Sequence, residues 1–142
     1  MTEPQVSVQR SFRLSSRTSE LLDSLSQQSN ESRNGLVERL LGEALRIEPH
    51  PLVRFRTGAA GRHEPYLSGT RLLVRQVVAQ LREVNGEIDE VAAYLGIAPG
   101  LVRAALNYYA DFGDEIDADA QWAVSVEAEE HSRWERQQAA LA

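Results

Sequence analysis

Few residues in this chain are of the types that catalyse reactions or bind metals. There is no cysteine, which excludes a disulfide framework, a thiolate zinc site and a cysteine nucleophile. The three histidines, His50, His63 and His131, are too far apart in the sequence to form a local metal motif. No segment assembles a nucleophile, a base and an oxyanion site. We therefore expect a protein that is not an enzyme and that uses no cofactor or metal.

Charged side chains are plentiful, and they are unevenly distributed. All 15 basic residues are arginines, and the net charge is −6. Residues 111–142 contain nine acids and two arginines, a balance of −7, whereas residues 1–110 contain 12 acids and 13 arginines, a balance of +1. The overall acidity therefore belongs to the C-terminal segment. It does not argue against a nucleic-acid-binding face upstream.

The acidic C-terminal segment also carries two tryptophans, Trp122 and Trp134. One interpretation of such a segment is a solvated helix or a disordered end. Tryptophans in a polar segment favour another, because buried aromatic side chains dominate the binding energy of interfaces. We expect residues 114–142 to form an acidic helix or tail that binds a partner protein through Trp122, Val126 and Trp134.

The first element expected along the chain is a single strand over VSVQRSFRL (6–14). Its apolar residues occupy alternate, even-numbered positions: Val6, Val8, Phe12 and Leu14. This alternation predicts a strand with one buried face, although Arg10 interrupts the apolar side. No partner strand follows nearby, so the strand edge has to be satisfied by another chain.

Two helices are predicted next, at about 16–28 and 33–46. A serine precedes each helix and can cap it, because the hydroxyl accepts a free backbone N–H of the first turn. The leucines and valine of the second helix form an apolar face that one strand and two short helices cannot bury. We therefore expect residues 1–48 to form a homodimer.

The second half is predicted to contain a hairpin and three helices. The segment EPHP (48–51) is a linker, because each proline disfavours helix at the residue before it. Two short extended runs, 52–56 and 71–74, flank a turn-rich stretch and predict a small β-hairpin or wing. Helices are expected at about 74–84, 87–95 and 99–112. Gly96 can supply the left-handed residue that ends the second of these helices.

The composition is that of a globular protein, with 42% hydrophobic and 25% charged residues in 142. No segment is apolar enough for a membrane span, and the N-terminus lacks the apolar run of a signal peptide. We expect a cytoplasmic protein with no membrane partner. The fold class expected is mainly α with short β, in three parts: residues 1–48, 49–113 and 114–142.

The order strand, helix, helix over residues 6–46 resembles the ribbon-helix-helix family of DNA-binding repressors and antitoxins. The resemblance rests on SFRLS (11–15), on the leucine-rich first helix and on SRNGLVERLLGEAL (32–45). It implies an intertwined dimer whose paired strands enter the major groove of operator DNA. At the matching positions, the residues that read bases are Gln9, Ser11 and Arg13. The residues implied to bind a phosphate at the start of the second helix are Ser32, Arg33 and Asn34.

Residues 51–117 resemble the small antitoxin-associated family catalogued as domain of unknown function 433. The resemblance rests on three stretches: SGTRLLVRQVVAQL (68–81), EVAAYLGIAPGLVRAALNYYA (90–110) and DEID (114–117). It implies a winged helix-turn-helix module whose partner is a nuclease-like toxin, a PIN-like or related ribonuclease. We favour a scaffold that faces the toxin, and a second DNA contact through Arg103 and Asn107 is the alternative.

Together the two resemblances imply a VapB-like type II antitoxin. Such a protein binds operator DNA as a homodimer, represses its own operon and neutralises its cognate toxin by direct binding. If the acidic segment is not the toxin surface, Tyr108 or Tyr109 is the next candidate. The alternatives are a dimeric transcriptional regulator without a toxin and a structural interaction module that binds no DNA.

Overall fold

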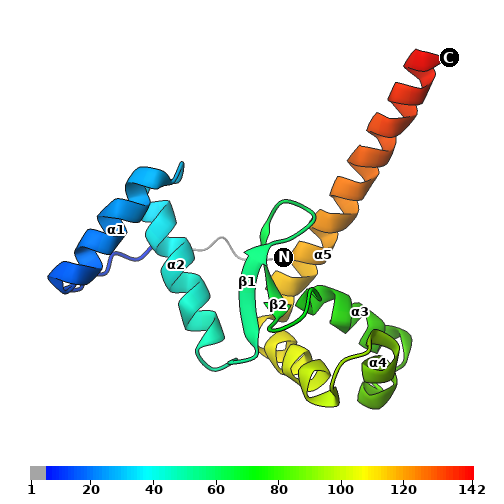
Figure 1. Ribbon diagram of the computed structural model, residues 1–142, viewed down its shortest axis with the longest axis horizontal. Helices are drawn as coiled ribbons and strands as arrows, with labels where there is room; N and C mark the ends of the chain where they lie inside the picture. Colours follow the sequence, from blue (N-terminus) through cyan, green and yellow to red (C-terminus); the bar gives the residue numbers. More distant parts are fainter. Residues whose placement is uncertain (1–5) are drawn as a thin grey trace. The chain divides into compact units, whose positions relative to one another are not determined.

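The computed structural model describes residues 6–142, and the chain divides into two compact units with the boundary after Arg46. The described residues are mainly helical, with a single two-stranded antiparallel sheet (Figure 1). This confirms the coarse fold class, mainly α with short β. No helix within residues 6–142 is both long enough and apolar enough to cross a membrane.

The first unit contains α1 (Ser16–Gln28) and α2 (Arg33–Ile47), and the second of these helices ends at the unit boundary. Both helices confirm the predicted ranges to within a residue. Ser15 and Ser32 cap them, since each hydroxyl accepts a first-turn backbone N–H, at 3.2 and 3.0 Å respectively. Local sequence signals were therefore enough to predict where these two helices begin and end.

The segment before α1 differs from the prediction. Residues 6–15 contain neither helix nor strand, so the strand predicted over 6–14 is wrong for a single chain. All of their side chains are exposed, whereas one face was expected to be buried. The physical reason is that a strand exists only where its N–H and C=O groups are paired, and one chain supplies no second strand here.

The second unit opens with a hairpin of β1 (Val53–Thr57) and β2 (His63–Leu67). The hairpin was predicted, but the position of its second strand at 71–74 is wrong, because β2 lies in the stretch expected to be turns. The observed loop, residues 58–62, is much shorter, and short loops are the usual hairpin connection. Gly61 has a φ of 81°, a left-handed conformation that glycine adopts without strain.

Three helices follow the hairpin and confirm the expected starts to within a residue. They are α3 (Val74–Glu83), α4 (Ile88–Leu95) and α5 (Pro99–Leu141). Gly96 ends α4 in the left-handed conformation, with φ 68° and ψ 34°, as predicted. Helix α5 bends at Phe112, where φ is −130° and ψ is 35°, and then continues through the acidic segment to Leu141 (Figure 1). Its expected end at about 112 is therefore wrong, because the kink at Phe112 bends the helix and does not terminate it.

The hairpin and all three helices contribute to one core in the second unit. Its buried residues are Val53, Leu67, Val74, Val77, Val78, Leu81, Val91, Ala92, Val102, Ala105, Tyr108 and Ile116. Leu106 is 37% exposed, whereas Tyr108 points into the core, because the packing sets the rotation of the helix. Residues 114–142, expected as a separate tail, begin inside this unit, where Ile116 and Ala123 are buried.

Candidate nucleic-acid and partner interfaces

The first unit exposes most of its apolar side chains. Of its described residues, 6–46, only Leu36 is buried. Ten large apolar residues are exposed: Val6, Val8, Phe12, Leu14, Leu21, Leu25, Val37, Leu40, Leu41 and Leu45. Folded domains seldom leave so much apolar surface open unless another molecule covers it. This set, named here the open apolar face, contains the residues that the sequence assigned to a dimer core.

The residues expected to read bases lie on the segment before α1. Gln9, Ser11 and Arg13 are all exposed, and they make no hydrogen bond or ion pair among the described residues. They alternate with the apolar residues of the open apolar face. In an extended strand, the two sets would therefore point to opposite sides. The structure leaves these three side chains available for a ligand.

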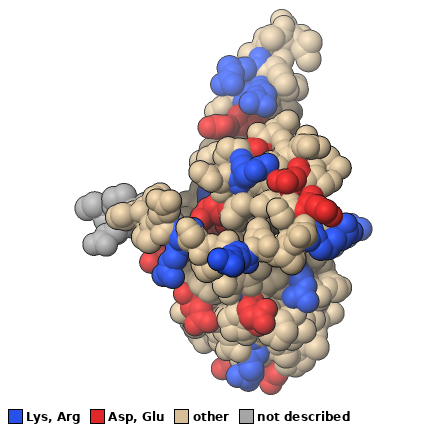
Figure 2. Space-filling view, turned by 90° about the vertical axis from the view of Figure 1, so that its left-hand side faces the viewer, with Lys and Arg blue, Asp and Glu red and all other residues tan. Residues whose placement is uncertain are grey.

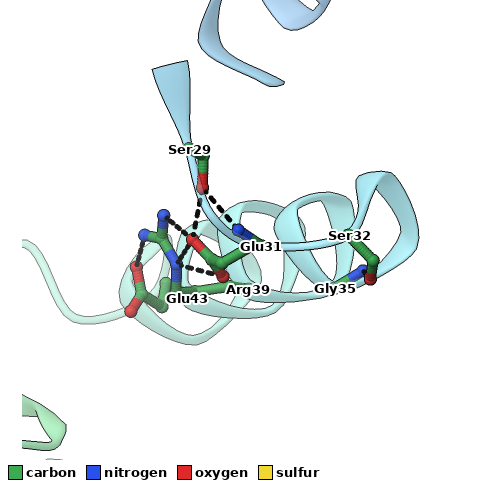
Figure 3. Close-up of polar contacts among 6 residues, drawn as sticks. All are labelled: Ser29, Glu31, Ser32, Gly35, Arg39 and Glu43. Carbon is green, nitrogen blue, oxygen red and sulfur yellow. Dashed lines mark hydrogen bonds and ion pairs between the residues drawn. The ribbon is translucent and has the colours of Figure 1, made fainter. Parts of the chain in front are cut away.

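The turn between α1 and α2 is fixed by polar contacts (Figure 3). Arg39 donates to both carboxylate oxygens of Glu31, with Nε–Oε1, Nε–Oε2 and Nη2–Oε1 distances of 3.1, 3.1 and 2.8 Å. Hydrogen bonding to Glu31 raises the pKa of the Arg39 guanidinium, which stays charged. The hydroxyl of Ser32 already accepts the N–H of Gly35, so it acts as a helix cap. The turn thus holds the start of α2 in one position.

Arg33 and Asn34 are the residues of this turn that remain able to bind an anion. Their backbone N–H groups belong to the first helical turn and have no partner within the helix. The Arg33 side chain lies 3.0 Å from Asp23, and both side chains are more than half exposed. Exposed ion pairs contribute at most about 1 kcal/mol, so a phosphate can replace this one at small cost. The geometry suits a phosphate at the positive end of α2.

Arg103 and Asn107 lie one turn apart on α5, and both are exposed. They border a pocket of about 200 Å³ that residues 49–53 also line. His50 lines this pocket too, but it is buried, and its Nε2 lies 2.7 Å from Oδ2 of Asp111. The pocket therefore offers one free guanidinium and one amide, which is a small basis for binding DNA.

Trp122, expected to anchor a partner, contacts its own chain. Its Nε1–H donates to the carbonyl of Ala60 at 2.9 Å, and the Arg62 guanidinium lies 5.4 Å from the ring centroid. Arg62 also pairs with Asp119 at 3.4 Å, so these contacts tie the hairpin loop, residues 58–62, to α5. The indole remains 44% exposed. Part of its surface is thus still available to a partner.

Beyond Ala123, helix α5 leaves the core. Every residue after it is exposed except Val126, which is partly buried. Trp134 is 55% exposed, and its ring stacks on His131 with 6.0 Å between the ring centroids. A helix exposed on all sides gains no burial energy from its own chain. This part of α5 therefore offers the exposed Trp134 to another molecule, and Val126 only in part.

The two tyrosines named as the next candidates have different surroundings. Tyr108 is 1% exposed and belongs to the core, so its assignment to a partner surface is wrong. Tyr109 is partly buried, and its hydroxyl lies 2.9 Å from Oδ1 of Asp117. Burial raises the pKa of Tyr109, and the hydrogen bond to Asp117 adds to this. Arg82 also contacts its hydroxyl, which makes this cluster a link between α3 and α5.

A buried group of charged residues that no sequence motif predicted joins β2, α3 and α5. Glu64 is 1% exposed, and its Oε1 accepts from Nε of Arg75 at 2.7 Å. Glu64 leaves no room for a side chain at Gly58. Asp119 is 9% exposed, and burial raises its pKa to about 6, against the opposing effect of Arg62. The only sequence signal for this group was an acid placed among apolar and aromatic residues in HEPYL.

Charge is not segregated on the face of the molecule drawn in Figure 2, where acidic and basic side chains are interspersed. Within residues 6–142, no three side chains of the metal-binding types come together. Binding through charge therefore has to rest on local groups of residues. Compared with models of known protein families, with curated proteins and with solved structures, the chain has no match.

Proposed function

We propose that this chain is a cytoplasmic antitoxin of a type II toxin–antitoxin system. It binds operator DNA as a homodimer, represses its own operon and neutralises a nuclease-like toxin by direct binding. The observation that carries the proposal is the open apolar face of the first unit, which leaves only Leu36 buried among residues 6–46. A second copy of the same unit has the matching apolar surface.

Dimerisation would cover that face in two ways. Pairing of two 6–14 segments would satisfy their backbone groups as an antiparallel ribbon and turn their apolar side chains inward. The α2 side chains Val37, Leu40, Leu41 and Leu45 are 37–64% exposed in one chain. Full burial of such a side chain stabilises by roughly 1.5–3 kcal/mol relative to full exposure. Completing their burial in both chains would therefore favour association.

The same pairing would direct the polar side chains of the ribbon, which alternate with its apolar side chains, outward. Arg13 suits a bidentate contact with guanine and Gln9 suits adenine, while Ser11 can donate or accept. Arg33 and the free N–H groups at the start of α2 would bind phosphates on either side. The first unit would thus read sequence with the ribbon and hold the DNA backbone with α2.

Antitoxin activity is supported by the charge of the C-terminal segment, since residues 111–142 carry a net charge of −7. A toxin that cleaves RNA needs a basic surface, and an acidic helix complements such a surface. The exposed Trp134 and the partly buried Val126 lie on the part of α5 that leaves the core. This end of α5 is the proposed toxin-binding segment.

The test uses the full chain and starts with its oligomeric state by light scattering at micromolar concentration. We expect a dimer, and we expect Leu40→Asp to abolish it because an unpaired charge would enter the dimer core. Ser24→Asp adds the same charge at an exposed polar position of α1 and should leave the dimer intact. A folded, monodisperse monomer of the unmodified chain would overturn the proposal.

Two further measurements separate the parts of the proposed function. Gel shifts should show salt-dependent binding to the DNA upstream of the chain's own gene and weaker binding to unrelated DNA. Co-expression with the product of the adjacent gene should yield a stable complex. DNA binding without such a complex would indicate a stand-alone regulator. A complex without DNA binding would indicate an interaction module.

A further inference from the structure

The β1–β2 hairpin and the chain that follows it hold an excess of arginine. Residues 53–75 contain five arginines and a single acid, Glu64. The five are Arg54, Arg56, Arg62, Arg71 and Arg75. This local balance is opposite in sign to that of residues 111–142. The overall charge of the chain hides it.

Two of the five arginines are neutralised within the second unit. Arg75 pairs with the buried Glu64 at 2.7 Å, and the arginine side chain is itself only 17% exposed. Arg62 pairs with Asp119 at 3.4 Å. Both ion pairs connect elements of the unit. These two arginines therefore have structural partners and are not free for a ligand.

The other three arginines have no carboxylate partner among the described residues. Arg54 donates to backbone carbonyls, including that of Val53 at 2.8 Å. Arg56 donates to the carbonyl of Arg71 at 2.6 Å. Arg54 and Arg71 are exposed, and Arg56 is partly exposed. Because a carbonyl oxygen carries no net charge, the positive charges of Arg54, Arg56 and Arg71 are not neutralised by an ion pair among the described residues.

The sheet brings the side chains of Arg54 and Arg56 to one face. Arg54 and Arg56 are two residues apart on β1, and alternate residues of a strand point to the same side. Tyr66 of β2 lies opposite Arg54 in the register, and the Arg56 guanidinium lies 5.3 Å from its ring centroid. The hydrogen bond from Arg56 brings the backbone of Arg71 to the same place. We name Arg54, Arg56, Tyr66 and Arg71 the hairpin arginine patch.

We propose that the hairpin arginine patch binds the phosphate backbone of DNA, as a second contact beside that of the first unit. Guanidinium groups donate two parallel hydrogen bonds to a phosphate, and a tyrosine hydroxyl donates a further one. The patch lacks the apolar centre typical of protein–protein interfaces, whereas protein–DNA interfaces are polar and positively charged. The contact is independent of base sequence.

The inference rests on the proposed function, because the first unit supplies the specific DNA. Once the first unit is bound, the second unit of the same chain is held near the duplex, and its effective concentration there is high. A weak backbone contact then adds to the affinity of the whole dimer. Its expected signature is a steeper dependence of affinity on salt.

The test compares full-length Arg54→Gln/Arg71→Gln with Arg133→Gln/Arg136→Gln. The control pair changes the charge equally and lies at the exposed end of α5. Arg56 is left intact because its contacts hold the hairpin. Each variant is titrated with the DNA upstream of the gene and with unrelated DNA of equal length, over a range of NaCl concentrations. Circular dichroism checks the fold, and Arg54→Lys/Arg71→Lys keeps the charge if the glutamine pair perturbs the hairpin.

We expect the slope of log affinity against log salt to become shallower by about 0.9 for each phosphate that the glutamine pair no longer neutralises. At about 0.1 M salt this weakens Kd by roughly tenfold or more, and by the same factor for both DNAs. The control pair should bind both DNAs with the affinity and salt dependence of the unmodified chain, and the lysine pair should retain most of the slope.

The remaining outcomes separate this proposal from the proposed function. If the unmodified chain prefers its upstream DNA and the glutamine pair keeps the full slope, the patch is not a DNA contact, although the first unit is. Equal binding of both DNAs by the unmodified chain, with a shallower slope in the variant, supports the patch and overturns specific recognition. Weaker binding by the variant to the upstream DNA alone would mean base reading and overturn the backbone assignment. If the glutamine pair no longer bound the product of the adjacent gene but bound DNA as the unmodified chain does, the patch would be a binding site for an acidic protein. That outcome would overturn the proposal.

Discussion

Asp119 makes the stability of the second unit depend on pH. Its carboxyl is 9% exposed, and burial raises its pKa from 3.8 to about 6. Arg62 and Arg75 oppose this rise, and Glu64 and Glu115 add to it. Because the folded state binds the proton more tightly, this contribution to stability is complete below pH 3.8. It is lost as the pH rises through about 6.

The size of the effect follows from the two pKa values. A rise from 3.8 to about 6 corresponds to about 3 kcal/mol, at about 1.4 kcal/mol for each tenfold change in proton affinity. Asp119→Asn removes the charge at every pH. The attraction of Arg62, which the variant also loses, is already contained in the pKa of about 6, because Arg62 opposes the rise. At about pH 8 we therefore expect the variant to be more stable by roughly 2–3 kcal/mol.

The assay is urea unfolding of the full chain between about pH 4 and pH 8. Trp122 fluorescence in a Trp134→Phe background reports the second unit, because Trp122 contacts Ala60 in the hairpin loop. The advantage of Asp119→Asn should vanish toward pH 4. Asp114→Asn, which removes an exposed acid from the same helix, should show no such dependence. If Asp119→Asn were less stable than the unmodified chain at pH 8, the reasoning from burial would be refuted.

Five further predictions address DNA binding, partner binding and stability. Arg13→Ala should weaken operator binding by roughly 1–3 kcal/mol and relax the preference at one base position, as gel-shift competition can measure. Arg33→Ala should weaken binding to all DNA sequences by a similar factor, and an effect confined to the operator would contradict its phosphate role. A chain ending at Val126 keeps the buried core residues of the second unit, so we expect it to be as stable as the full chain and to bind DNA. It should not form a complex with the product of the adjacent gene. In the full chain, Trp134→Ala should lower the affinity for that gene product by about 2 kcal/mol or more in calorimetry. Gly96→Ala should destabilise the second unit by about 1–2 kcal/mol in thermal unfolding, because φ is 68° there.

The helices of both units could be predicted from the sequence because their signals are local. A capping serine, a 3.6-residue apolar period and a glycine stop act within a few residues of one another, whatever the rest of the chain does. Accordingly, α1, α2, α3 and α4 begin and end within a residue or two of the predicted positions. The open apolar face also follows from the sequence, because its width exceeds what three short elements can bury.

Other features depended on tertiary contacts that no local signal encodes. The second hairpin strand lies at 63–67 because pairing and loop closure select it over the equally extended run at 71–74. The rotation of α5 buries Tyr108 in place of Leu106, a choice made by packing. Burial of Asp119 arises only where residues distant in the sequence meet. Local signals thus determined which segments are helical, whereas long-range packing determined which side chains are buried, because burial depends on neighbours that the chain brings together only when it folds.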